Sequence, residues 1–127
     1  MKQNVALSIA SLVAIVLFPV HLTHDIVFGL DSMTRAQTFT YLLIMLVSLY
    51  GTVELSGRRS GYVIMLLLGI LAVAMPVLHT VGGPRAASRG FFFVWTLLAL
   101  GASGAFSATL AARELWRSLR GARQAAK

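Results

Sequence analysis

The chain has 127 residues, of which 57% are hydrophobic and only 12% are charged. Soluble proteins average about 25% charged residues, and the eleven Lys or Arg and four Asp or Glu present here are too few to coat a globule. A disordered chain is excluded as well, because disorder requires low hydrophobicity. The absence of cysteine excludes disulfide scaffolds, iron–sulfur clusters and cysteine nucleophiles. The composition therefore predicts a membrane protein.

Four apolar stretches have the length of about 20 residues that a helix needs to cross a bilayer. They cover residues 5–28, 36–55, 62–80 and 91–111, and a basic tail over residues 112–127 follows them. A helix satisfies its backbone amides within one segment, as lipid requires. The sequence therefore predicts one domain over residues 1–127, an all-α transmembrane bundle of four helices with no soluble domain.

The ends of the second and third spans have recognisable capping residues. Thr34 and Gln37 have the T-x-x-Q spacing of a capping box at the start of the second span. Gly57 is expected to end that span, since glycine tolerates the left-handed cap conformation. Ser60 is expected to be the N-cap of the third span.

Small residues recur one turn apart in the fourth span. Gly101-x-x-x-Ala105 and Gly104-x-x-x-Ala108 are patterns that let two helices approach closely in lipid. The fourth span is therefore expected to pack either centrally in the bundle or at a dimer interface.

The distribution of Lys and Arg predicts the orientation of the bundle. With four spans, the N-terminus, the connection between the second and third spans, and the tail lie on one side of the membrane. That side has eight cations and the other side has three: Lys2, Arg58, Arg59, Arg113, Arg117, Arg120, Arg123 and Lys127, against Arg35, Arg85 and Arg89. The positive-inside rule then predicts that both termini are cytoplasmic. Topology and anionic lipid account for the basic tail, so nucleic acid is not an expected partner.

The three histidines of the chain are expected to gather near the outer boundary of the membrane. His21, His24 and Asp25 fall within a 100° sector of one helix face, because each residue turns the helix by about 100°. His21 and His79 lie 16 and 17 residues from the cytoplasmic ends of their spans, rises of about 24 and 25 Å. His21, His24 or Asp25 is therefore predicted to lie close enough to His79 to share a polar pocket with it, directly or through water.

The chemistry of this His/Asp cluster is left open by the sequence. Imidazoles and a carboxylate suit Zn²⁺ or Cu²⁺, paired imidazoles on facing helices could ligate a haem, and neutral His with Asp could pass protons. The simplest interpretation is a packed or interfacial role, in which the side chains bond to each other or to water. The metal is therefore unknown at this stage, and no cofactor is expected.

Glu54 is the second candidate for a functional side chain, near the inner end of the second span. An acid within an apolar span is costly and is a functional hypothesis by default. Because Glu54 lies within a turn of Gly57, it can reach Arg58 or Arg59. A structural ion pair is therefore the favoured interpretation over a functional inner-side carboxylate.

Three stretches resemble a family of small bacterial four-helix integral membrane proteins that is uncharacterised in function. The stretches are HLTHDI over residues 21–26, RRSGYVI over 58–64 and FFFVWTLLALG over 91–101. The resemblance implies a multi-pass protein of the bacterial inner membrane. It implies no active site and no substrate.

Three functions are compatible with these observations. The leading prediction is a non-enzymatic membrane protein that associates with the lipid bilayer, with other membrane proteins or with itself as a homo-oligomer. The alternative is a small transporter or proton-coupled permease that uses the His/Asp cluster and Glu54, and the third is a haem- or metal-binding membrane protein. No enzyme is expected, because no Ser-His-Asp arrangement, P-loop or dinucleotide fingerprint is present.

Overall fold

The computed structural model of the chain describes residues 2–28, 33–81 and 90–125. These residues form four α-helices and no β-strand: α1 (Lys2–Val27), α2 (Arg35–Val53), α3 (Arg59–Val81) and α4 (Phe91–Ala125). All four are long and apolar enough to cross a membrane. The prediction of an all-α chain with four helices is therefore confirmed for the described residues.

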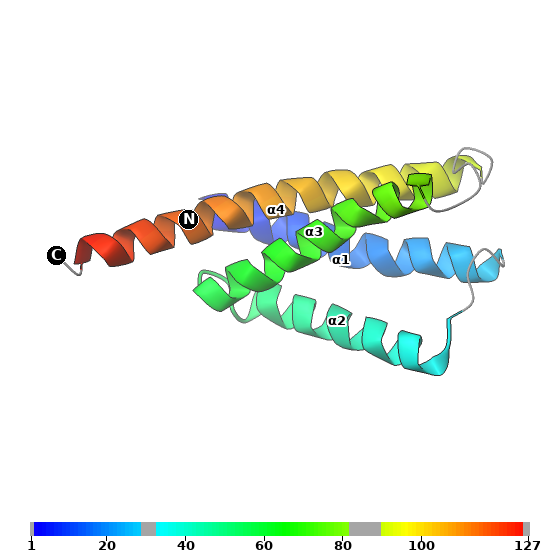
Figure 1. Ribbon diagram of the computed structural model, residues 1–127, viewed down its shortest axis with the longest axis horizontal. Coiled ribbons are helices and arrows are strands. Elements are labelled where there is room, and N and C mark those ends of the chain that lie inside the picture. The colour runs from blue at the N-terminus through cyan, green and yellow to red at the C-terminus, as the bar shows by residue number, and fades with distance from the viewer. Residues whose placement is uncertain (1, 29–32, 82–89, 126–127) are drawn as a thin grey trace.

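The helices lie side by side, each running opposite to the one before it (Figure 1). The N-terminal end of α1, the C-terminal end of α2, the start of α3 and the C-terminal part of α4 lie at one end, which we call the basic end. The C-terminal ends of α1 and α3 lie at the other end. The most extensive packing is between α3 and α4, followed by α1 and α4, whereas α2 has fewer contacts with α3 and α1.

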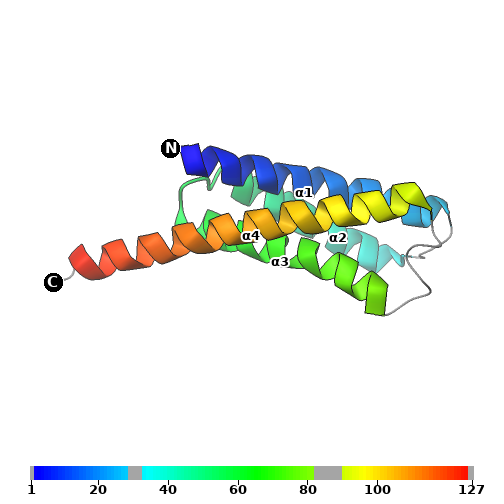
Figure 2. The same cartoon turned by 90° about the horizontal axis from the view of Figure 1, so that it is seen from above.

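The fourth helix is longer than its predicted span. It has 35 residues, so that residues 112–125 of the expected tail continue the helix and residues 126 and 127 lie outside the described part. A helix of this length measures about 52 Å, against about 30 Å for the hydrocarbon core of a bilayer. Its C-terminal part consequently projects past the other three helices (Figure 2). The reason is local, since Ala, Leu, Glu and Arg are strong helix formers.

The predicted start of α2 is confirmed, whereas the predicted end of α2 and the predicted start of α3 are corrected, because α2 already ends at Val53 with Glu54 as its C-cap. Thr34 and Gln37 form both bonds of the capping box, and Gly57 has the left-handed φ of +82° in the turn that follows α2. Ser60 is not an N-cap, because α3 already begins at Arg59. The amide of Tyr62 donates to the carbonyl of Arg58 at 3.1 Å, so the helical hydrogen bonds begin two residues earlier than predicted.

Close approach of backbones explains the tight packing between α3 and α4. A Cβ atom built on Gly104 would lie 2.5 Å from the Cβ of Ala72 and 2.8 Å from the carbonyl oxygen of Gly69. A side chain at position 104 therefore has no room. Of the small residues predicted to mediate close approach of the fourth span, Gly101, Gly104 and Ala108 pack against α3 within the same chain, whereas Ala105 is exposed.

The interior changes character along the bundle axis. Two apolar clusters fill it: Leu7, Tyr62, Met65, Leu110 and Ala111, then Ala14, Phe18, Leu68, Ala72 and Leu100. Beyond Phe18, the next buried residue on the same face of α1 is His21. The fold thus places a buried polar layer at the end of the bundle opposite the basic end.

Candidate metal centre

One turn of α1 supplies two buried polar side chains to this layer. His21 and Asp25 are four residues apart and therefore project from the same face of the helix. They are 1% and 4% exposed. The Nε2 atom of His21 lies 3.7 Å from Oδ2 of Asp25.

His79 joins them from α3. Its Nε2 atom lies 3.6 Å from the same Oδ2 of Asp25. The two imidazole nitrogens and the carboxylate oxygen all lie within 4.8 Å of one another. The structure therefore brings together His21, Asp25 and His79, which we call the His–Asp–His triad, from two helices that run in the same direction.

The hydrogen bond of His79 determines which of its nitrogens faces the carboxylate. Nδ1 lies 2.9 Å from the carbonyl oxygen of Met75, one turn earlier in α3. A carbonyl can only accept, so Nδ1 carries the proton and donates it. In the neutral ring, Nε2 therefore presents a lone pair to Asp25.

The hydrogen bonds of Thr96 in α4 are compatible with the same tautomer of His21. The threonine hydroxyl has one proton, which it donates to the backbone carbonyls of Phe92 and Phe93, both at 3.0 Å. Its oxygen then accepts from Nδ1 of His21, also at 3.0 Å. With these tautomers both imidazoles turn Nε2 toward the carboxylate, where either a proton or a metal ion can bridge the facing atoms.

Two of the three separations are close to those around a metal ion. Tetrahedral bonds of 2.0–2.1 Å place neighbouring ligand atoms about 3.4 Å apart. The two His–Asp distances, 3.7 and 3.6 Å, are slightly longer than this, and the separation between the two histidine nitrogens, up to 4.8 Å, would have to shorten for both to bind one ion. A ligating histidine usually donates its other ring N–H to a backbone carbonyl or another fixed acceptor, which sets its tautomer and orientation. The Met75 carbonyl and the Thr96 hydroxyl occupy those positions here.

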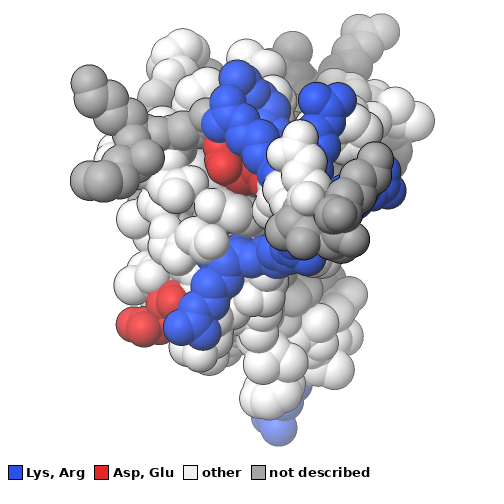
Figure 3. Space-filling view, turned by 90° about the vertical axis from the view of Figure 1, so that its left-hand side faces the viewer, with Lys and Arg blue, Asp and Glu red and all other residues white. Residues whose placement is uncertain are grey.

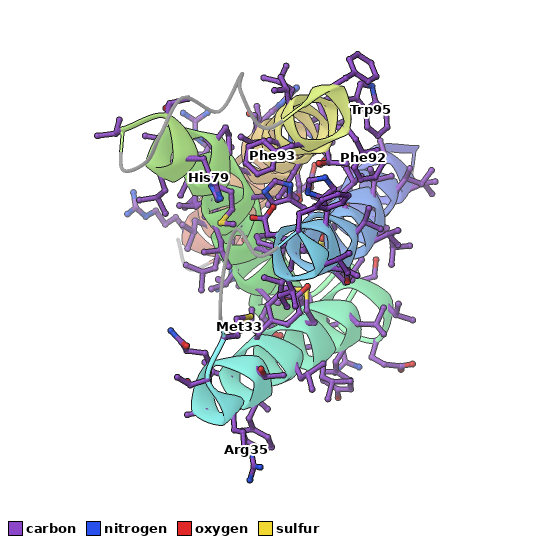
Figure 4. All side chains as sticks on the ribbon, turned by 90° about the vertical axis from the view of Figure 1, so that its right-hand side faces the viewer. Met33, Arg35, His79, Phe92, Phe93 and Trp95 are labelled. Atoms are coloured by element: carbon purple, nitrogen blue, oxygen red, sulfur yellow. The ribbon has the colours of Figure 1, made fainter. Side chains whose placement is uncertain are left out.

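The triad is enclosed on one side and borders a cavity on the other. The ring of Phe93, fully buried, packs on His21 and His79 with centroid distances of 4.9 and 5.5 Å. Figure 4 looks onto this end of the molecule and shows Phe93 of α4 near His79 of α3. Toward α2, the three triad residues line a cavity of about 470 Å³.

His24 contacts the carboxylate from a different direction. Its Nδ1 lies 3.5 Å from Oδ1 of Asp25, the oxygen that does not face the other two histidines. The ring packs on Phe28 and Phe92, at centroid distances of 4.6 and 5.3 Å. His24 therefore touches the carboxylate only at the limit of hydrogen-bond distance and is not a fourth member of the triad.

A haem does not fit between His21 and His79. Oδ2 of Asp25 is almost equidistant from the two Nε2 atoms, at 3.7 and 3.6 Å. Oδ2 therefore lies close to the plane midway between the two Nε2 atoms. A porphyrin whose iron was ligated by both histidines would have to occupy that plane.

Glu54 is far from the triad, at the basic end of α2. It is exposed and occupies the C-cap position, where its amide donates to the carbonyl of Tyr50 at 2.9 Å. Within the described part of the chain it forms no ion pair, so the expected pair with Arg58 or Arg59 is not found. The Arg59 guanidinium instead donates to the backbone carbonyl of Ser118 in α4 at 2.9 Å.

Sequence reasoning did not identify Thr96 and Phe93. Thr96 is five residues into the fourth helix, at a depth comparable to that of His79 in α3. A hydroxyl in an otherwise apolar run at that depth is the signal that could have found it. Phe93 gives no such signal, because an aromatic residue near a helix end is equally expected at a lipid interface.

Comparison with protein-family models, with curated proteins and with solved structures gave no match for this chain. The resemblance to a bacterial membrane family therefore stays a prediction.

Proposed function

We propose that this chain is a multi-pass membrane protein that binds one divalent first-row transition-metal ion between α1 and α3. The ligands are Nε2 of His21, a carboxylate oxygen of Asp25 and Nε2 of His79. The observation that carries the proposal is the convergence of these three atoms while both Nδ1 atoms are engaged elsewhere. Two imidazoles with one carboxylate form a ligand set used by zinc and by mononuclear iron.

A metal ion accounts for the arrangement better than a proton does. A proton shared between Asp25 and one imidazole satisfies that pair and leaves the second Nε2 lone pair facing the carboxylate. A metal ion bonds to all three atoms at once.

We also propose that the basic end faces the cytoplasm and that the triad lies near the opposite face of a bacterial inner membrane. The number of cations at each end supports this orientation. The predicted association with lipid or other membrane proteins, and the predicted transport role of the cluster, remain predictions alongside metal binding.

Metal analysis of the full-length chain tests the proposal. Protein purified in detergent without a histidine tag is stripped with a chelator, reloaded with Zn²⁺, passed through a desalting column and assayed for bound metal. We expect one Zn²⁺ per chain. Asp25→Asn and His79→Gln should each weaken the affinity by more than about 100-fold, beyond what loss of an outer-shell partner costs.

Two further variants control for the loss of a carboxylate and for the loss of an imidazole ring outside the triad. Glu54→Gln removes a carboxylate at the other end of the bundle, and His24→Gln removes a ring beside the triad. Both should retain Zn²⁺ affinity within about threefold, and circular dichroism should show the same helix content for all four variants. Absence of tight Zn²⁺ in the parent protein, or equal affinity in all variants, would overturn the proposal.

A further inference from the structure

We infer that the metal ion has an open coordination position that faces the cavity between α1, α2 and α3 and accepts the carboxylate of a small amphipathic acid. This inference rests on the proposed metal site. It concerns what else the site binds, and three features of the structure support it.

The first feature is the number and placement of the ligands. Zinc in proteins is normally four-coordinate, and sites with three protein ligands keep the fourth position for an external group. Phe93 and Thr96 cover the side toward α4. The remaining position is directed toward the cavity, whose volume of about 470 Å³ is within the range of 300–1,000 Å³ found for small-molecule sites.

The second feature is charge. A divalent ion with Asp25 as its only acidic ligand has a net charge of +1. Of the described residues that line the cavity, Asp25 is the only acid, and none is Lys or Arg. An uncompensated buried charge is costly, so a monoanionic fourth ligand is favoured because it makes the site neutral.

The third feature is the wall of the cavity. Away from the triad, most of the lining is apolar, contributed by Phe18, Leu22, Ile44, Leu71 and Met75. Burial of each methylene group against such a wall strengthens binding by about fourfold. A carboxylate with a short alkyl chain therefore matches both the charged and the apolar parts of the site.

The cobalt form of the full-length protein provides the test. Co²⁺ replaces Zn²⁺ with similar ligands, and its visible absorption reports the coordination sphere. Acetate and octanoate are titrated separately into the Co²⁺-loaded protein, with 1-octanol as the uncharged control for partitioning into detergent. We expect both acids to change the spectrum, octanoate to bind at least tenfold more tightly than acetate, and 1-octanol to have no effect.

Two exposed threonines of α2 provide a matched pair of variants. Thr40 lines the cavity, whereas Thr38 is not among its lining residues, and each hydroxyl donates to a backbone carbonyl one turn earlier. Thr40→Phe should weaken octanoate binding at least tenfold without changing Co²⁺ affinity. Thr38→Phe should change neither.

The possible outcomes separate this inference from the proposed function. If Co²⁺ binds and neither acid changes its spectrum, the open position does not exist and the metal site stands. If acetate and octanoate bind equally, or Thr40→Phe behaves as Thr38→Phe does, the cavity is not the ligand site and the inference is wrong. If Co²⁺ itself fails to bind, the proposed metal site fails, and the inference fails with it.

Discussion

Two hydrogen bonds outside the triad determine its chemistry at the level of single residues. The carbonyl of Met75 and the hydroxyl of Thr96 accept from the Nδ1 atoms of His79 and His21. With those nitrogens protonated, the Nε2 atoms are left as ligands. If either ring adopted the other tautomer, it would present an N–H to Asp25, and the site would become a simple hydrogen-bonded pair.

Thr96→Val tests this positioning role. Valine has a similar shape and cannot accept the proton of Nδ1, so His21 loses the hydrogen-bond partner of that nitrogen. We expect Zn²⁺ affinity to fall by about 10- to 100-fold, as for other outer-shell partners of ligating histidines. Competition with a chromophoric chelator measures the change.

Thr109→Val is the matched control for that experiment. Thr109 also lies in α4 and donates to a backbone carbonyl one turn earlier, that of Ala105 at 2.7 Å, but it is exposed. Its replacement should leave Zn²⁺ affinity unchanged. Equal effects of the two substitutions would show that the loss comes from the helix and not from His21.

The residues of the cluster could be predicted from the sequence, but their partners on α4 could not. Helix rise alone indicates that His21 and His79 lie at the same depth, and the i, i+4 spacing indicates that Asp25 faces the same way. The contact between His21 and Thr96 joins residues 75 positions apart. It depends on the rotation of α4 about its axis, which packing against α3 determines and no local spacing reports.

At the level of elements, the pairing of α3 with α4 determines that rotation. Gly69 and Gly104 face each other, and a Cβ atom on Gly69 would lie 2.7 Å from the carbonyl oxygen of Gly104. Thr96 is eight residues before Gly104, about 12 Å along α4. The close contact of the two backbones therefore positions the helix that bears Thr96 and Phe93.

Gly104→Ala and Gly121→Ala are expected to change the stability of the protein in opposite directions, although both lie in α4. At position 104 the added methyl group meets Ala72 and the backbone of α3, so we expect a loss of about 1–3 kcal/mol in stability. At position 121 nothing lies within 4 Å of the added atom. There the higher helix propensity of alanine should raise stability by up to about 1 kcal/mol.

Thermal denaturation in detergent, followed by circular dichroism, compares the two variants with the parent chain. The expected order of midpoints is Gly121→Ala at or above the parent and Gly104→Ala below it. A Gly104→Ala midpoint equal to that of the parent would mean that the two helices can separate without cost.

The helices themselves could be predicted more reliably than their ends. Long apolar runs predict all four, because hydropathy over about 20 residues is a strong signal. The start of α3 was not predicted, and the predicted fourth span ended at residue 111, whereas α4 continues to Ala125. Hydropathy predicts which part of a helix can contact lipid, not where the helix ends. The helix α4 continues beyond its apolar part because the polar residues that follow also favour helix formation.

At the level of the whole molecule, the charge and the triad lie at opposite ends of the bundle. Figure 3 looks onto the basic end and shows Lys and Arg side chains gathered around it. The described part of that set is Arg58, Arg59, Arg113, Arg117, Arg120 and Arg123. The positive-inside rule therefore predicts that the cavity beside the triad is nearer the outer face of the membrane than the cytoplasm.

Cysteine labelling tests this orientation without background, because the natural chain has no cysteine. Ser56→Cys lies between α2 and α3 at the basic end, Gln124→Cys lies near the end of α4, and Met33→Cys precedes α2 at the other end. In intact bacterial cells, a membrane-impermeant maleimide that reaches the periplasm should label only Met33→Cys. After the cells are broken open, all three positions should react.

Two results would contradict this orientation in different ways. Labelling of Ser56→Cys and Gln124→Cys in intact cells, with Met33→Cys protected, would mean that the bundle is inverted and the triad faces the cytoplasm. Labelling of only one of the first two positions would mean that α3 and α4 do not both cross the membrane. The expected pattern requires an even number of crossings between Ser56 and Gln124 and an odd number between Met33 and Ser56, as four spanning helices provide.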